Sequence, residues 1–245
     1  MVSGGGDLGA AEVGVLAEAF AQAAREMRRS VPVPKGAPYY GLDIGLSDLT
    51  ALDLLCREGI FRKYQSAAVL ECGLGGTARW WSARFGCRVV GFDARHRLLA
   101  AGRRLQEGAP VAPRAELACS RPAPLAASAE TFTHVWCVDP GSAAEDIAAE
   151  ALRVLRPSGF FGLHGSECWA GEVERWEAAL GAAGFVALER RRVPLVEPPS
   201  YVAAARTVLR HVLEGRPEAA RLAALCGEPQ ALRATAVQLI AQRPS

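Results

Sequence analysis

Residues 69–77, VLECGLGGT, are the stretch of sequence that decides the fold. An apolar run typical of a strand (67–71) leads into the glycines, and a helical pattern follows over 77–85. Gly73 permits a tight turn off the strand, and Gly75 carries no side chain where a ligand must approach the backbone. Amides at the helix start then point at that ligand. The stretch predicts a ligand site at a strand-to-helix turn, with a purely structural glycine turn as the alternative.

An acidic residue follows the next strand-like run. Asp93 lies twenty residues after Gly73, directly past the run 88–92. A carboxylate at that place can accept hydrogen bonds from both hydroxyls of a ribose. The alternative is that Asp93 only caps the helix expected at 95–106. Because strand, glycines, helix, strand and acid fall in phase, we predict a ligand that contains a ribose.

Strand-like and helical patterns alternate on both sides of this core. The expected helices are about nine to thirteen residues long, which is typical of βαβ units with a parallel sheet and right-handed crossovers. The prolyl-glycyl stretch 157–159 is predicted to be a turn before the fifth strand. The expected strands are 67–71, 88–92, 114–118, 132–138 and 160–163, and the expected helices are 77–85, 95–106, 143–155 and 172–183.

The N-terminal region lacks strand signals. Apolar residues recur at helical spacing over 8–29, three prolines then interrupt the pattern, and a second helix is expected over 49–56. Residues 1–63 are therefore predicted to form an N-terminal helical cap.

The C-terminal part departs from a simple repeat of strand and helix. Two late strands, 185–193 and 236–242, are separated by a strongly helical stretch over 198–226, expected in two pieces. Such strands can form an antiparallel pair at one edge of the sheet. The predicted fold over 64–245 is thus a doubly wound, Rossmann-like, mixed seven-stranded sheet with an antiparallel edge strand, and a helical insertion at about 198–233 precedes the last strand.

Composition narrows the class of protein. The chain has 245 residues, half of them hydrophobic, and a formal net charge of +2, which does not favour nucleic-acid binding. No apolar run is long enough to cross a membrane, and the first residues show no signal-peptide pattern. The seven cysteines lie at least fifteen positions apart, which gives no metal-site spacing and indicates thiols in a reducing compartment. We expect a cytoplasmic protein without metal, nucleic-acid or membrane partners, and the sequence leaves a homodimer open.

Three motifs resemble those of class I S-adenosylmethionine-dependent methyltransferases. ECGLGGT (71–77) is similar to their first motif, VVGFD (89–93) to their second strand with its ribose-binding acid, and ALRVLRPSG (151–159) to the segment that leads into their fifth strand. The likeness is greatest to the branch that acts on small molecules such as amino-acid amines, sterols and quinones, and it covers roughly 64–164. It implies S-adenosylmethionine as cofactor and methyl transfer, by in-line displacement, to a small-molecule N, O or C acceptor.

The resemblance also implies roles for individual residues. Glu71, Gly73 and Gly75 would lie near the methionine part of the cofactor, and Asp93 would hold its ribose. The loop after the third strand lacks the acid that usually meets the adenine amine, and Ser120 stands there as a substitute acceptor. The chain also lacks the histidine-bearing turn that commonly follows the fourth strand.

Catalytic candidates are few, because a cofactor with an activated methyl group asks the protein mainly for positioning and electrostatics. Asp139 and His164 follow strands at the end of the sheet where doubly wound folds bind ligands. Asp139 is a candidate substrate or cofactor contact, with a turn-forming aspartate before proline as the alternative. His164 is a candidate general base, with a hydrogen-bonded structural histidine as the alternative. Tyr39 and Tyr40 are candidates for substrate binding in a lid, or for packing in the cap.

Two other functions stay open. The departures from the family pattern fit a methyltransferase-like binding or partner protein that has lost turnover. The spacing Gly73-x-Gly75-x-x-Ala78 together with Asp93 also fits a nicotinamide-dependent oxidoreductase. The single domain, the late strand pair and the absence of a Tyr-x-x-x-Lys pair speak against that second reading.

Overall fold

The computed structural model describes residues 10–34, 37–44, 52–53, 55, 65–109, 115–138, 140–166, 170–194, 200–217 and 235–245. Its strands are β1 (Ser66–Leu70), β2 (Arg88–Asp93), β3 (Ala115–Cys119), β4 (Phe132–Val138), β5 (Leu155–Ser166), β6 (Val186–Pro194) and β7 (Thr235–Gln242). Its α-helices are α1 (Ala10–Met27), α3 (Gly76–Phe85), α4 (His96–Glu107), α5 (Ala144–Val154), α6 (Ala170–Ala183) and α7 (Ser200–Leu213), and a short 3₁₀ helix, η1, spans Leu42–Ile44.

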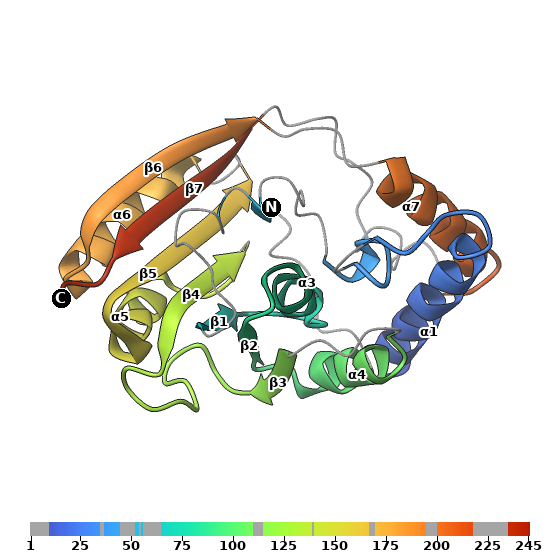
Figure 1. Ribbon diagram of the computed structural model, residues 1–245, viewed down its shortest axis with the longest axis horizontal. Helices are drawn as coiled ribbons and strands as arrows, with labels where there is room; N and C mark the ends of the chain where they lie inside the picture. The colour runs from blue at the N-terminus through green and yellow to red at the C-terminus, as the bar shows by residue number, and fades with distance from the viewer. Residues whose placement is uncertain are drawn as a thin grey trace.

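The strands form one seven-stranded sheet in the order β3-β2-β1-β4-β5-β7-β6 (Figure 1). Strands β1 to β5 pair in parallel, whereas β7 runs antiparallel to both of its neighbours. The predicted mixed sheet with a late antiparallel pair is confirmed. In detail, the antiparallel strand β7 lies one position inside the sheet, and β6 forms the edge.

Helices cover both faces of the sheet because its strands alternate two apolar sets of side chains. Leu70, Val135 and Phe161 point to the face that packs against α5 and α6. Val69 and Trp136 belong to the opposite set, which packs against α3. This burial on both faces by helices is the doubly wound arrangement that the alternation of strands and helices predicted; Figure 1 shows the helices around the sheet.

The fifth strand is longer than expected. It begins at Leu155, directly after α5 ends, so the predicted turn at 157–159 lies inside β5. A register shift against β4 between Phe132 and His134 accommodates this stretch, and Ser158 adopts a φ of 61°. The signals of a turn were therefore those of a bulged strand.

A third apolar cluster joins the flanking helices. Buried side chains of α1, α4 and α7 pack together at the end of the molecule away from β6 and β7 (Figure 1). The predicted N-terminal cap and the first piece of the predicted insertion thus meet in one helical layer. Leu52, Asp53 and Leu55 are helical, in agreement with the helix expected there. The rest of that helix, and residues 218–234 of the insertion, lie outside the described residues.

Candidate active site

The glycine turn connects β1 to α3 and has backbone angles that few other residues adopt. Gly73 has a φ of 56° and Gly75 a φ of 75°. A Cβ at Gly75 would lie 2.5 Å from the Leu117 side chain, so a larger residue would displace that side chain and would also be strained by the positive φ. A Cβ at Gly73 would meet no atom within 4 Å, so the backbone at this residue borders open space. The predicted turn is present and leaves room beside Gly73.

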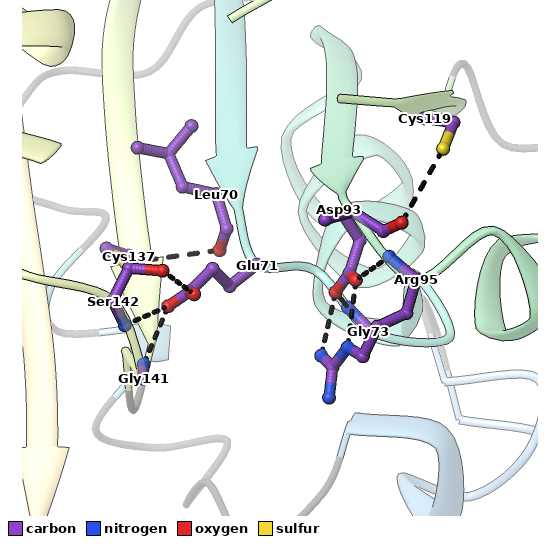
Figure 2. A network of polar contacts seen from close by, with 10 residues as sticks. Leu70, Glu71, Gly73, Asp93, Arg95, Cys119, Cys137, Gly141 and Ser142 are labelled. Atoms are coloured by element: carbon purple, nitrogen blue, oxygen red, sulfur yellow. Dashed lines mark hydrogen bonds and ion pairs between the residues drawn. The ribbon is translucent and has the colours of Figure 1, made fainter. Parts of the chain in front are cut away.

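Asp93, at the end of β2, is tied to this turn (Figure 2). The Gly73 amide donates to Asp93 Oδ2 at 2.8 Å, and the Arg95 amide donates to Oδ1 at 2.8 Å. The carboxylate is almost fully buried, and charge-assisted bonds of this kind stabilise a buried anion. The structure therefore joins Gly73 and Asp93, which the sequence had placed in one site.

Arg95 is a member of this cluster that the sequence reading did not single out. Its Nε donates to Asp93 Oδ1 at 2.9 Å and its Nη2 to Oδ2 at 2.8 Å. This hydrogen bonding to Asp93 raises the pKa of the guanidinium, and the nearby charge of Glu71 adds to the effect. The Asp-x-Arg spacing at a strand end was the signal that could have pointed to the pair.

Glu71 links the turn to a loop at the end of the neighbouring strand. Its carboxylate accepts hydrogen bonds from the Gly141 amide at 2.7 Å and the Ser142 amide at 3.4 Å, and from the Ser142 hydroxyl. Figure 2 shows the side chain directed toward these residues, which follow β4. Glu71 has a φ of 52°, a conformation that costs a non-glycine residue about 1–3 kcal/mol. Glu71 thus fixes the β4–α5 loop beside the turn.

Ser120, the predicted adenine contact, is hydrogen-bonded within its own loop. The Ser120 hydroxyl accepts from the Ala126 amide at 2.9 Å and donates to the Arg121 carbonyl at 2.9 Å. These bonds order the loop after β3. A role for Ser120 toward adenine stays a prediction. Asp139, the predicted contact after β4, lies outside the described residues.

His164 lies within β5, opposite Val138, with 3% of its surface exposed. Its Nδ1 is 3.3 Å from Gln238 Nε2, and burial lowers its pKa to about 4. The ring is therefore neutral at pH 7 and a weak base. A catalytic role for it stays a prediction, and the geometry favours the structural alternative.

Tyr39 and Tyr40 are placed away from the turn, inside the helical layer. Both rings are buried, with the Tyr39 hydroxyl donating to the Leu105 carbonyl and the Tyr40 hydroxyl donating to the Val31 carbonyl at 2.7 Å. Tyr40 also meets Tyr201 of α7 edge to face. These contacts match the packing alternative, and a substrate-binding role stays a prediction.

A buried ion pair between Arg79 and Asp43 lies next to the glycine turn. Arg79 of α3 donates to Asp43 Oδ2 through Nη2 at 2.7 Å and to the Gly102 carbonyl through Nη1 at 3.1 Å. Both charged side chains are at most 2% exposed. A Cβ at Gly102 would lie 2.4 Å from the Leu74 carbonyl oxygen, so α4 packs directly against the turn. The pair connects η1, α3 and α4 beneath the candidate site.

Within the residues that the structure describes, no three His, Cys, Asp or Glu side chains are grouped as a metal site would require. None of the described helices is both long and apolar enough to span a membrane.

Part of the chain matches a known protein family. Residues 69–159 match the family described as methyltransferase domain. No curated protein sequence matches the chain. That family match coincides with the glycine turn, Asp93 and the helix-to-β5 segment, which are the parts of the site described above.

Solved structures share the fold at low sequence identity. Phosphoethanolamine N-methyltransferase 2 of Haemonchus contortus, bound to S-adenosylhomocysteine, is 17% identical with a TM-score of 0.58. The alignment covers 80% of this chain but 53% of that one, so this chain spans about half the length of the Haemonchus contortus enzyme. A putative sarcosine dimethylglycine methyltransferase of Galdieria sulphuraria is 14% identical (TM-score 0.58, 80% and 86% covered). The [4+2]-cyclase SpnF is 18% identical (TM-score 0.58, 82% and 84% covered).

These neighbours establish the fold, and the family model matches the part of it that contains the glycine turn and Asp93. Strand order, glycine turn and strand-end acid agree with both. Residues 69–159 are thus similar to a methyltransferase domain, and the chain as a whole has the fold of the solved methyltransferases to which it was compared.

Proposed function

We propose that the protein binds S-adenosylmethionine and transfers its methyl group to a small-molecule N, O or C acceptor. The observation that carries the proposal is the unit of Gly73 and Asp93, in which a buried strand-end carboxylate stands beside an open glycine turn. The family match and the small acceptors named for the similar methyltransferases support it.

The residues present fit this cofactor. Asp93 offers a carboxylate for a ribose, Gly73 borders open space, and α3 begins at Gly76 with its first amides directed toward the turn. When bound, the cofactor supplies a methyl group activated by a sulfonium. In the proposal Asp93 and Gly73 hold the nucleoside, and Glu71 fixes the 141–142 loop at the same end of the sheet. These residues supply positioning and electrostatics, the main demands that a pre-activated group makes on the protein.

A binding protein without turnover is the second candidate. Three observations favour it: Arg95 takes up the Asp93 carboxylate, the Ser120 hydroxyl is bonded within its own loop, and His164 is buried. The [4+2]-cyclase neighbour also shows that a related fold serves a reaction not named for methyl transfer. An oxidoreductase is less supported, because the antiparallel β7 differs from the parallel sheet order 3-2-1-4-5-6 of dinucleotide-binding folds.

A turnover assay separates the two candidates. The full chain is incubated with S-adenosylmethionine labelled in its methyl group and with panels of amines, phenols and carboxylic acids. We expect labelled product and an equal amount of S-adenosylhomocysteine with at least one panel, and loss of both in Asp93→Ala. Tight cofactor binding without turnover on any panel would favour the binding protein.

Three narrower expectations accompany this proposal. We keep the division into a cap (1–63) and a methyltransferase domain (64–245), with the insertion at about 198–233. The contact of α1 with α7 suggests that cap and insertion together border the acceptor site. A cytoplasmic location and the state of association stay predictions.

A further inference from the structure

The carboxylate of Asp93 has no acceptor position left. An ionised carboxylate offers about four lone-pair positions. Two are filled by the backbone amides of Gly73 and Arg95, each at 2.8 Å. The other two are filled by Nε and Nη2 of the Arg95 side chain, one on each oxygen, at 2.9 and 2.8 Å. Figure 2 shows the guanidinium lying against the carboxylate with both bonds formed.

A ribose needs the same two positions. Its vicinal hydroxyls donate to an acid as a pair, one to each oxygen, which is what the guanidinium fork does here. We propose that Arg95 is an internal ligand of the ribose position, and that a nucleoside cofactor binds by displacing the guanidinium from Asp93. This inference rests on the proposed function, and it makes Arg95 a determinant of cofactor affinity.

The two partners differ in how easily they can leave. The Asp93 side chain is 2% exposed, whereas that of Arg95 is 51% exposed. The backbone bonds of Gly73 and Arg95 hold Asp93 in place, and they do not depend on the Arg95 side chain. The guanidinium can therefore move into solvent while the carboxylate keeps its position. The ribose hydroxyls then restore the two lost bonds.

The exchange predicts tighter binding when Arg95 is removed. Calorimetric titration compares the full chain with Arg95→Ala, Arg95→Lys and the control Arg97→Ala, which removes another exposed positive charge two residues away. The probes are S-adenosylhomocysteine, whose net charge is zero at pH 7, adenosine, and 2′,3′-dideoxyadenosine, which lacks both hydroxyls. A partly exposed ion pair is worth about 1 kcal/mol at most, so Arg95→Ala should lower Kd about fivefold for the first two probes. Arg95→Lys should fall between Arg95→Ala and the unchanged chain.

The controls and salt sharpen the test. The dideoxy probe should gain nothing from Arg95→Ala, and Arg97→Ala should leave every Kd within about twofold. Raising NaCl screens the ion pair, so S-adenosylhomocysteine should bind the unchanged chain more tightly at high salt than at low salt. Its Kd for Arg95→Ala should be the same at both salt concentrations. An unchanged or weaker Kd in a folded Arg95→Ala protein overturns the inference and leaves the proposed function standing. Failure of S-adenosylhomocysteine to bind either protein overturns both.

Discussion

The residues of the candidate site, at the ends of β1 and β2, differ in how far the sequence could predict them. Gly73 and Asp93 were predictable because a turn with positive φ and a strand-end acid depend on local sequence. The partners of Glu71 were not predictable, because Gly141 and Ser142 lie in a loop distant in the chain. The Asp93–Arg95 pair could have been indicated by its spacing, but the bond itself depends on the Arg95 rotamer. Arg95 changes the interpretation of Asp93 from an open acceptor to one already engaged.

The burial of His164 predicts how the stability of the folded protein depends on pH. Its pKa is about 4 in the folded protein against an ordinary value of 6.5, because burial disfavours the charged ring. Between these pH values the unfolded chain binds the extra proton, so stability falls as pH drops from 6.5 and the loss is complete below 4. The total contribution is about 3 kcal/mol of unfolding free energy.

Urea unfolding between pH 4 and 7.5 measures this contribution. The variant His164→Gln removes the titrating group and keeps a polar side chain beside Gln238, so its stability should depend less on pH than that of the unchanged chain. Equal pH dependence of the two proteins would contradict a buried, neutral His164.

At the scale of helices and strands, local periodicity located nearly every described element to within a few residues. The exception is β5, in which residues 157–159 carry turn signals but lie inside the strand, between the pairs Leu155–Phe132 and Phe160–His134, at a register shift against β4. Strand pairing over long separations decides such a case, and a local pattern does not contain it. The link between η1 and α3 was equally hidden, since Asp43 and Arg79 meet across thirty-six positions.

The Asp43–Arg79 ion pair is predicted to stabilise the packing of η1 on α3. Asp43→Ala leaves the Arg79 guanidinium buried without its carboxylate, and we expect a loss of about 3–5 kcal/mol in unfolding free energy. The matched control is Asp43→Leu with Arg79→Met, which replaces both charges by apolar groups and should be close to neutral. Chemical denaturation of both proteins tests the pair. If the single variant were as stable as the double one, the pair would not hold η1 on α3.

On the scale of the whole molecule, segments from opposite ends of the chain build one helical layer. The sequence separated an N-terminal cap from a late insertion, and each was recognisable by its lack of strand signals. Their contact was not predictable, because α1 and α7 present apolar faces that fit several partners. In the structure Phe20 and Ala23 of α1 and Leu209 of α7 are buried in one apolar cluster, which also contains residues of α4.

The shared layer predicts coupled stability. Leu209→Ala in α7 removes a buried side chain and should cost about 2–5 kcal/mol. Hydrogen exchange of the α1 amides should become faster in the same variant, since α1 loses its support. The exposed neighbour Thr207→Ala should change stability by about 0.5 kcal/mol or less. Unchanged exchange in α1 would show that α1 does not depend on α7.

Direct binding of the cofactor tests the central claim for the whole molecule. The full chain is titrated calorimetrically with S-adenosylmethionine and, separately, with NAD, and the titrations are repeated with Asp93→Ala. The account predicts micromolar binding of S-adenosylmethionine that Asp93→Ala abolishes, and no binding of NAD. Binding of NAD with no binding of S-adenosylmethionine would contradict it, as would S-adenosylmethionine binding that does not depend on Asp93.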